Sequence, residues 1–423
     1  MSRRSMALAP LWSSRVFSVD VDGGPVYFRL QNEHHRGKGG KVVKRLFETG
    51  MLKDDGCYSI LVSSGDKLRN AKFYWELKDK LLGGLSQGCR LSPMCAFLPG
   101  VQDSLIRGFL VKDSSIATER LLRQFVQRDD PALVCSYTPG DTEDDPLWTQ
   151  HLWTHVQNHY IVPSEPPGYH PATLNMVNSD VFYSFQEARD VLKKCADIIP
   201  EATSVLELLP RGGGGCGSVE ARSEPAFPII VLEGLDATGK TTLTESLRDA
   251  LGATLLRSPP QCLSPWRARF DQEPPIVRRA FYAVGNYITA QQIVHHASKK
   301  PVIVDRFWHS TAAYAIATAV SGSTCDLPTE GSELYRWPGD LLRPSLVVLL
   351  TLDPEERKRR LKGRGQEKTK EEHELDRNQH FRLRVEEAYR RISGPTCISV
   401  DASSSAEQVF QQVMLLIKAK CHL

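Results

Sequence analysis

The residues best suited to do chemistry in this 423-residue chain form one uninterrupted stretch, residues 234–241. They read Gly-Leu-Asp-Ala-Thr-Gly-Lys-Thr and match the pattern GxxxxGK[ST] without a gap. In this pattern the glycines let backbone amides turn inward around phosphates, and the helix that follows contributes partial positive charge. Lys240 is expected to pair with the β- and γ-phosphates of ATP, and the Thr241 hydroxyl to ligate Mg²⁺. The predicted ATP-binding residues are Gly234, Leu235, Asp236, Ala237, Thr238, Gly239, Lys240 and Thr241.

A second charged group ends the apolar run 302–304, where Asp305 and Arg306 stand side by side. A carboxylate at this point can ligate Mg²⁺, and an arginine guanidinium can bind two phosphate oxygens through a bidentate pair of hydrogen bonds. The chain lacks the NKxD sequence with which GTPases read guanine, and this run does not end in Asp-Glu as in motor ATPases. The pair therefore favours an acceptor that is itself a phosphate ester.

Short apolar strands alternate with helical patterns around both charged groups. A leucine stripe at Leu243, Leu247 and Leu251 predicts a helix directly after the phosphate loop. Such alternation indicates a P-loop NTPase-type parallel sheet flanked by helices, with ligands at the carboxyl ends of its strands. The expected strands are 229–232, 253–256, 301–304, 346–352 and 397–400, and the last expected helix is 406–418.

Glycines divide the chain in two. Residues 211–218 read RGGGGCGS, and four successive glycines cannot lie within a helix or strand. The expected divisions are a linker at 211–226, a catalytic α/β domain at 227–423 and a separate mixed α/β domain at 20–210.

The N-terminal domain carries few chemical signals. A strand is expected at 26–30, and amphipathic helices are expected at 115–127 and 184–194. Residues His151, His155 and His159 would share one helix face, but the glutamate of a metalloprotease helix is absent. A structural stripe is therefore favoured over a metal site, and the pattern gives this domain no function.

Charge and composition exclude several classes of protein. A net charge of +3 does not suit a strongly basic nucleic-acid binder, and no apolar run approaches the length of a membrane span. The 10 cysteines form no CxxC pair, which is typical of free thiols in a reducing compartment.

The first nineteen residues resemble a mitochondrial targeting segment. They contain Arg3, Arg4 and Arg15, several serines and no acidic residue before Asp20. We therefore expect residues 1–19 to direct the protein to mitochondria; if they do not, the protein would be cytoplasmic.

At this point residues 227–423 resemble the thymidylate kinase family. The likeness includes an EGLD lead-in to the phosphate loop and the DRF sequence at 305–307, which is similar to a DRY motif. Further matching segments are 257–259, 310–314, 343–355, the LID-like stretch 357–374 and 401–402. The resemblance implies that Asp305 organises Mg²⁺ and that Asp401 lines the adenine. It also implies that the acceptor nucleotide contacts Asp236, Arg257, Tyr282, Asn286, Arg306 and Tyr314.

The same resemblance places catalytic positive charge in the LID. Ala237 stands where some relatives have an arginine, so the charge is expected from Arg360 and Arg364, which with Arg357 share one helix face. Arg364 lies between two glycines and is expected to reach the transferring phosphate. Arg360 is expected to stack on adenine or hold the LID shut.

One departure bears on the substrate. Asn286 stands where the family commonly has arginine in FxAxRW, while Tyr282 or Phe281 keeps a ring for base stacking. A thymidylate-kinase-like domain behind a long N-terminal extension and a targeting segment resembles kinases of pyrimidine nucleoside monophosphates. This resemblance, with which Asn286 is compatible, implies transfer of phosphate from ATP to CMP, UMP, dCMP or dUMP. Two alternatives remain: a thymidylate kinase proper, and a nucleotide-binding scaffold in which the N-terminal domain does the work. The expected partners are nucleotides and Mg²⁺, and no nucleic acid. No membrane span is expected, and a homodimer is compatible with the sequence.

Overall fold

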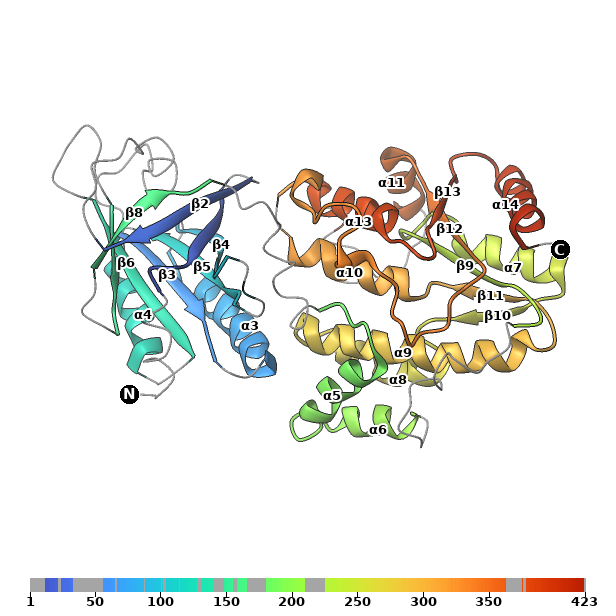
Figure 1. The fold of residues 1–423 in the computed structure, drawn as a ribbon, viewed down its shortest axis with the longest axis horizontal. Helices are drawn as coiled ribbons and strands as arrows, with labels where there is room; N and C mark the ends of the chain where they lie inside the picture. Colours follow the sequence, from blue (N-terminus) through green and yellow to red (C-terminus); the bar gives the residue numbers. More distant parts are fainter. Residues whose placement is uncertain are drawn as a thin grey trace. The chain divides into compact units, whose positions relative to one another are not determined.

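In the computed structural model the chain divides into two compact units, with the boundary between them after residue 178 (Figure 1). The first unit carries strands β1 to β8, and the second carries the phosphate loop. The structure describes residues 12–21, 24–32, 56–64, 67–86, 88–99, 101, 104–113, 115–127, 131–139, 148–154, 158–165, 180–209, 225–320, 322–362, 375 and 378–421.

The first unit is a closed antiparallel barrel with the strand order β1-β2-β8-β7-β6-β3-β5-β4. The pairing of β1 with β4 closes it, so every strand has two neighbours. Its strands are β1 (Val16–Val21), β2 (Gly24–Gln31), β3 (Gly56–Val62), β4 (Arg90–Phe97), β5 (Ile106–Asp113), β6 (Ala132–Thr138), β7 (Thr149–Leu152) and β8 (Asn158–Pro163). The expected strand at 26–30 lies within β2.

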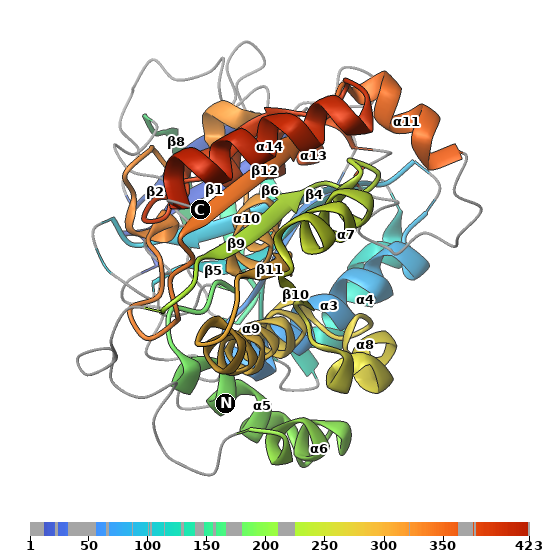
Figure 2. The same ribbon diagram turned by 90° about the vertical axis from the view of Figure 1, so that its right-hand side faces the viewer.

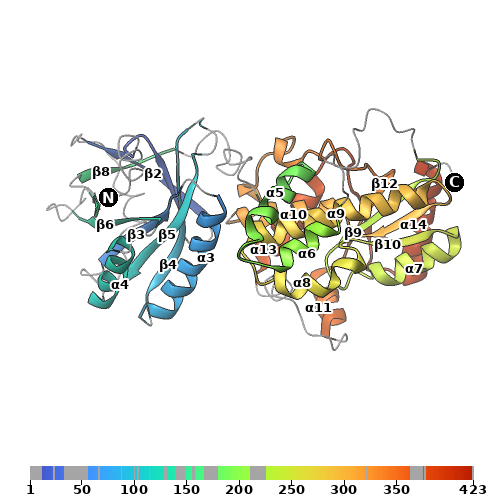
Figure 3. The same cartoon turned by 90° about the horizontal axis from the view of Figure 1, so that it is seen from below.

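Two helices, α3 (Lys67–Gly84) and α4 (Ile116–Gln127), lie along the outside of the barrel (Figure 3). Strand β3 shows why they are needed, because it is apolar on both faces. Leu61 points into the barrel core, whereas Ile60 joins an outer core with Leu77 of α3 and Leu122 of α4. Helix α4 confirms the helix expected at 115–127, and the separate N-terminal domain is confirmed as a barrel with covering helices.

The histidine stripe is not helical. His151 lies on β7 and His159 on β8, and the two strands pair antiparallel. His155 lies outside the described residues. Among the residues that the structure describes, no cluster of three or more histidine, cysteine or acidic side chains could hold a metal. The helical interpretation was wrong because residues four apart lie on one face of a β-strand as well as on one face of a helix.

The expected targeting segment overlaps the barrel. Trp12 is buried, and the buried Arg15 guanidinium donates to the carbonyl of Ser104 at 2.6 Å. Phe17 of β1 stacks on Phe28 with ring centroids 4.9 Å apart. Residues 12–19 are therefore part of the folded unit, and the targeting role of residues 1–19 stays a prediction.

The second unit contains a five-stranded parallel sheet in the order β10-β11-β9-β12-β13. Its strands match all five expected runs: β9 (Ile229–Gly234), β10 (Thr254–Arg257), β11 (Val302–Asp305), β12 (Leu346–Thr351) and β13 (Ile398–Asp401). Its helices are α5 (Phe185–Cys195), α6 (Glu201–Glu207), α7 (Lys240–Leu251), α8 (Ser264–Phe270), α9 (Pro275–Ala297), α10 (Trp308–Ala319), α11 (Pro354–Lys362), α13 (Gln379–Arg391) and α14 (Ala406–Cys421).

Helices cover both faces of this sheet. Helices α7 and α14 pack on one face, while α9 and α10 contact the strands from the other (Figure 2). Leu243 and Leu247 of the predicted stripe are buried in the core under α7. Among the described residues, no helix is long and apolar enough to cross a membrane.

Helices α5 and α6 belong to the second unit, not to the N-terminal domain as the expected boundary at 210 implied. They lie beside α8 and α9 in Figures 1 and 3, and α5 packs along α9. Phe185, Leu192 and Cys195 are buried in this contact region. The glycine-rich stretch 211–224 lies outside the described residues. The expected domain boundary at residue 210 is wrong because the apolar face of α5 packs on α9 of the second unit. Composition alone does not show which surface an apolar helix face will cover.

Candidate functional site

The phosphate loop connects β9 to α7 and has an unusual backbone. Gly234 has φ +137°, and a Cβ there would lie 2.5 Å from the Leu350 carbonyl oxygen of the neighbouring strand. Gly239 has φ +88° and directly precedes α7. Ala237 has φ +68°, a left-handed conformation that costs a non-glycine residue energy. The loop is therefore held in a fixed curve at the amino end of a 12-residue helix.

Lys240 is buried inside this curve. Its Nζ donates hydrogen bonds to the carbonyl oxygens of Gly234 at 3.0 Å and Leu235 at 2.7 Å. Burial, followed by the charge of nearby Arg306, lowers the pKa of Lys240 to about 7. The ammonium is poised to exchange these carbonyl oxygens for phosphate oxygens.

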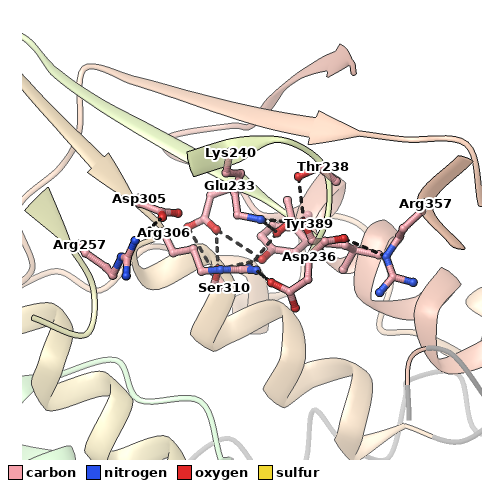
Figure 4. Close-up of polar contacts among 12 residues, drawn as sticks. Glu233, Asp236, Thr238, Lys240, Arg257, Asp305, Arg306, Ser310, Arg357 and Tyr389 are labelled. Atoms are coloured by element: carbon pink, nitrogen blue, oxygen red, sulfur yellow. Dashed lines mark hydrogen bonds and ion pairs between the residues drawn. The ribbon is translucent and has the colours of Figure 1, made fainter. Parts of the chain in front are cut away.

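Arg306 bridges β11 to the phosphate loop (Figure 4). Its guanidinium donates to the Gly234 carbonyl at 2.8 Å and to Asp236 Oδ1 at 2.6 Å. Its φ of +66° turns the chain sharply between β11 and α10. Burial alone would raise the pKa of Asp236, but the charges of Arg306 and then Lys240 hold that pKa well below its usual range. Two cations and one carboxylate thus share one small space beside the loop.

Glu233 completes this group, although sequence reasoning gave it no role. Its buried carboxylate accepts from the Phe307 N–H at 2.8 Å, the Ser310 hydroxyl and the Tyr389 hydroxyl at 3.3 Å. Burial raises its pKa, while the hydrogen bond from Ser310 and the charge of Arg306 oppose that rise. Glu233 therefore fixes the start of α10, and with it the turn that carries Arg306. Its signal in the sequence was a carboxylate at the end of an otherwise apolar strand.

Asp305 and Thr241 offer oxygen atoms that fit Mg²⁺. Asp305 lies at the end of β11, and its buried Oδ1 has no hydrogen-bond partner in the structure. Its Oδ2 lies 3.6 Å from a guanidinium nitrogen of Arg257, the predicted acceptor-side arginine. Thr241 is exposed in the first turn of α7. Because Mg²⁺ in phosphate-transferring sites takes only one or two carboxylates and completes its shell with phosphate and water, these donors suffice.

The structure brings part of the LID to the phosphate loop. Arg357 is buried on α11, and its Nε donates to the Asp236 carbonyl at 3.1 Å, so it anchors that helix. Arg360 donates to the Ala402 carbonyl at 3.0 Å, and its guanidinium lies near the place that a Cβ on Gly239 would take. Arg360 thus lies between the loop and the predicted adenine segment.

The two other predicted residues of the nucleotide side are placed differently. The Asp401 carboxylate is exposed and accepts from the Ser403 backbone N–H at 2.9 Å, so it caps a local turn. The next residue, Ala402, is buried. Arg364 lies outside the described residues, and its role stays a prediction.

On the acceptor side, Asn286 is buried between two hydroxyl groups. Its Oδ1 accepts from Ser258 at 2.7 Å, and its Nδ2 donates to Thr311 at 3.1 Å. Ser258 lies in the loop after β10, and Thr311 lies on α10. The residue that replaces the usual arginine thus joins three elements through neutral hydrogen bonds.

The aromatic residues of this side divide into core and surface. Phe281 is fully buried and stacks on Phe270 at 4.5 Å, so it is a core residue. Tyr282 is half-buried and donates to Asp271 at 2.7 Å, which leaves it as the candidate for base stacking. Tyr314 is buried, and the guanidinium of Arg279 lies over its ring at 5.9 Å. Arg279 was missed, although a buried arginine within the apolar pattern of α9 was a visible signal.

Comparisons with known proteins identify the family of this chain. The family model described as thymidylate kinase matches residues 232–413. The chain is 43% identical to the human protein "UMP-CMP kinase 2, mitochondrial" over 382 residues, which cover 86% of this chain and 81% of that protein. It is 28% identical to a thymidylate kinase of Schizosaccharomyces pombe, over 45% of this chain and 90% of that one. A solved thymidylate kinase from Candida albicans aligns with 46% of this chain and 92% of its own, at 21% identity and a TM-score of 0.36. The chain belongs to the thymidylate kinase family of nucleoside monophosphate kinases.

Proposed function

We propose that this chain transfers the γ-phosphoryl group of ATP to pyrimidine nucleoside monophosphates, namely CMP, UMP, dCMP and dUMP, in mitochondria. The observation that carries the proposal is the position of Arg306. Its guanidinium contacts both Gly234 and Asp236 of the phosphate loop, beside the loop lysine. A cation held there can bind a second phosphate next to the phosphates of ATP. The likeness to the human protein named UMP-CMP kinase 2 supports the choice of pyrimidines.

In this proposal each cation of the site has its own phosphate. Lys240 leaves the loop carbonyls and binds the β- and γ-phosphates, while Arg306 releases Asp236 and grips the acceptor phosphate. Asp236 is then free to accept from the acceptor sugar. Such fixed charges stabilise the negative charge that spreads over the migrating group, because they need no rearrangement at the moment of transfer.

Thr241 and Asp305 would hold Mg²⁺. When bound, the ion neutralises charge on the β- and γ-phosphate oxygens. The unpartnered Oδ1 of Asp305 supports this assignment. Arg364 and Arg360 of the LID would add positive charge around the transferring phosphate and the adenine.

The acceptor base would meet neutral hydrogen-bonding groups. Asn286 stands where the family commonly has an arginine, and its amide bonds to the hydroxyl groups of Ser258 and Thr311. Tyr282 would stack on the base. A neutral amide can donate and accept, so it can serve both cytosine and uracil rings.

A substrate panel tests the proposed function. Initial rates with ATP and CMP, UMP, dCMP, dUMP or dTMP should show efficient turnover of the cytosine and uracil nucleotides and slow turnover of dTMP. If dTMP has the highest kcat/KM, the chain is a thymidylate kinase proper. If no monophosphate turns over, the scaffold alternative gains support. The same sample, measured by light scattering, tests the homodimer.

The proposed location has its own test. A reporter fused to residues 1–19 should enter mitochondria, and changing Arg3, Arg4 and Arg15 to Gln should stop import. Cytosolic fluorescence from the unchanged fusion would contradict a targeting role for these residues.

A further inference from the structure

Residues 180–209, here called the strap, form part of the kinase unit although they precede the residues matched to the family. The strap contains α5 and α6 and turns a continuous apolar face toward the rest of the unit. Its buried residues are Val181, Phe182, Phe185, Ala188, Leu192, Cys195, Ile199, Ala202, Val205 and Leu209.

The start of the strap is fixed to the kinase core through hydrogen bonds. Trp308, the first residue of α10, donates from Nε1 to the Phe182 carbonyl at 3.2 Å. The Tyr183 hydroxyl donates to the Leu334 carbonyl at 2.9 Å. The strap therefore contacts α10 at Trp308, two residues beyond Arg306 and next to the turn that carries Arg306.

Asp340 forms a second junction, between the strap and α9. One carboxylate oxygen accepts from the Phe185 N–H at 2.8 Å, and the other accepts from the Tyr287 hydroxyl. The Phe185 ring packs edge-on against the Tyr287 ring, with centroids 5.3 Å apart. Burial, and then the charge of Asp340, raise the pKa of Tyr287, which keeps this hydroxyl protonated as a donor. A single carboxylate thus joins the strap to the middle of α9.

Helix α9 is also the helix that faces the acceptor site. Asn286 directly precedes Tyr287 and bonds to Ser258 and Thr311. Arg279, two turns earlier and so on nearly the same face of α9 as Asn286, lies over Tyr314. In a helix, adjacent residues are fixed about 100° apart, so a rotation that moves Tyr287 moves Asn286 equally. Whatever holds Tyr287 therefore sets the direction of Asn286.

We propose that Asp340 is a positioning residue for acceptor binding, because it joins the strap to Tyr287 and so fixes the orientation of α9. This inference rests on the proposed function. The strap, which precedes the phosphate loop in the chain, would then support the acceptor-binding site. ATP binding would not depend on the strap.

The test uses the full-length chain and the variant Tyr287→Phe, which removes one hydroxyl and keeps the ring. The KM for CMP should rise about fivefold or more, while the KM for ATP stays within about twofold. Asp340→Ala should have the same effect or a larger one. The matched control is Ser184→Ala, which removes the N-cap of α5 but leaves the Asp340 junction in place. The control should lower the melting temperature while both KM values stay unchanged.

The KM for CMP in the two variants decides whether Asp340 positions α9. A rise in the KM for CMP in Tyr287→Phe, absent in Ser184→Ala, supports the proposal. An unchanged KM for CMP in a folded Tyr287→Phe overturns it. An equal rise in both variants also overturns it, because general loosening of α5 would then explain the effect. If the wild-type chain phosphorylates no monophosphate, the proposed function has failed instead.

Discussion

Inside the barrel, the Trp12 indole donates to Gln150, Gln150 donates to Tyr137, and Tyr137 pairs with Ser59, all at 2.7–2.9 Å. The kinase unit buries polar groups of another kind around its phosphate loop. There Lys240, a cation with a lowered pKa, lies near buried carboxylates and a second cation. The barrel network is neutral and satisfied, whereas the kinase cluster brings two cations and two carboxylates together. Buried polarity alone therefore does not mark a functional site; a cluster of several buried charged groups beside a phosphate loop does.

The backbone shows the same contrast. Among the described residues, the two non-glycine residues with positive φ are Ala237 and Arg306, and both lie in the kinase site. Strain of this kind persists where surrounding structure holds it, and it often serves function. In this chain Glu233 helps to stabilise the backbone of Arg306, because its carboxylate accepts a hydrogen bond from the N–H of the next residue, Phe307.

The largest effect should follow removal of the loop cation. Lys240→Ala should lower kcat by at least about a thousandfold, because the transition state loses its main protein charge. Circular dichroism should match the wild type. Activity within about tenfold of wild type would show that the charged cluster is not catalytic. Buried charge would then distinguish the kinase unit from the barrel no better than neutral polarity does.

The LID arginines should separate into two roles. Arg364→Ala should lower kcat about a hundredfold or more with little change in the KM for ATP, because an arginine that reaches the transferring phosphate acts in the transition state. Arg360→Ala should instead raise the KM for ATP, because Arg360 bonds to the Ala402 carbonyl beside the loop. Steady-state kinetics with varied ATP measures both. A near-normal kcat for Arg364→Ala would move the catalytic charge elsewhere.

Proton uptake should reveal the poised state of Lys240. With a pKa of about 7 in the free protein, this lysine is mostly neutral at pH 8. Bound phosphates favour the ammonium form, so ATP binding at pH 8 should take up about one proton, and binding at pH 6 much less. Calorimetry in buffers of different ionisation enthalpy measures the uptake. Lys240→Met should remove it, and equal uptake in that variant would assign the proton to another group.

The smallest effect on catalysis should come from the barrel. Gln150→Leu leaves the Trp12 indole without its acceptor and should lower the free energy of unfolding by about 1–3 kcal/mol. Because this network holds no uncompensated charge, kcat/KM should stay within about twofold of wild type. Urea unfolding and the CMP assay test both parts. A large loss of activity in a folded variant would mean that the barrel interior serves the kinase reaction.

Features that depend on neighbouring residues could be predicted from the sequence. The phosphate loop is contiguous, so its spacing alone predicted the turn, the helix after it and the position of Lys240. Apolar runs predicted the five strands of the parallel sheet, because a strand covered on both faces must be apolar throughout. The Asp305-Arg306 pair followed from its place at a strand end.

Features that depend on distant partners could not be predicted. Gly-rich composition suggested a boundary near residue 211, yet α5 and α6 belong to the kinase unit, because α9 offers α5 an apolar surface and α6 packs against α5. The closed barrel depends on the pairing of β1 with β4, which brings Val16 opposite Phe97 across 80 residues of chain. Glu233 and Asp340 gained their roles only from the donors that folding placed around them. Local spacing determines the parts, but long-range burial and hydrogen bonding decide which parts meet, because their free energy depends on contacts that no single stretch of sequence contains.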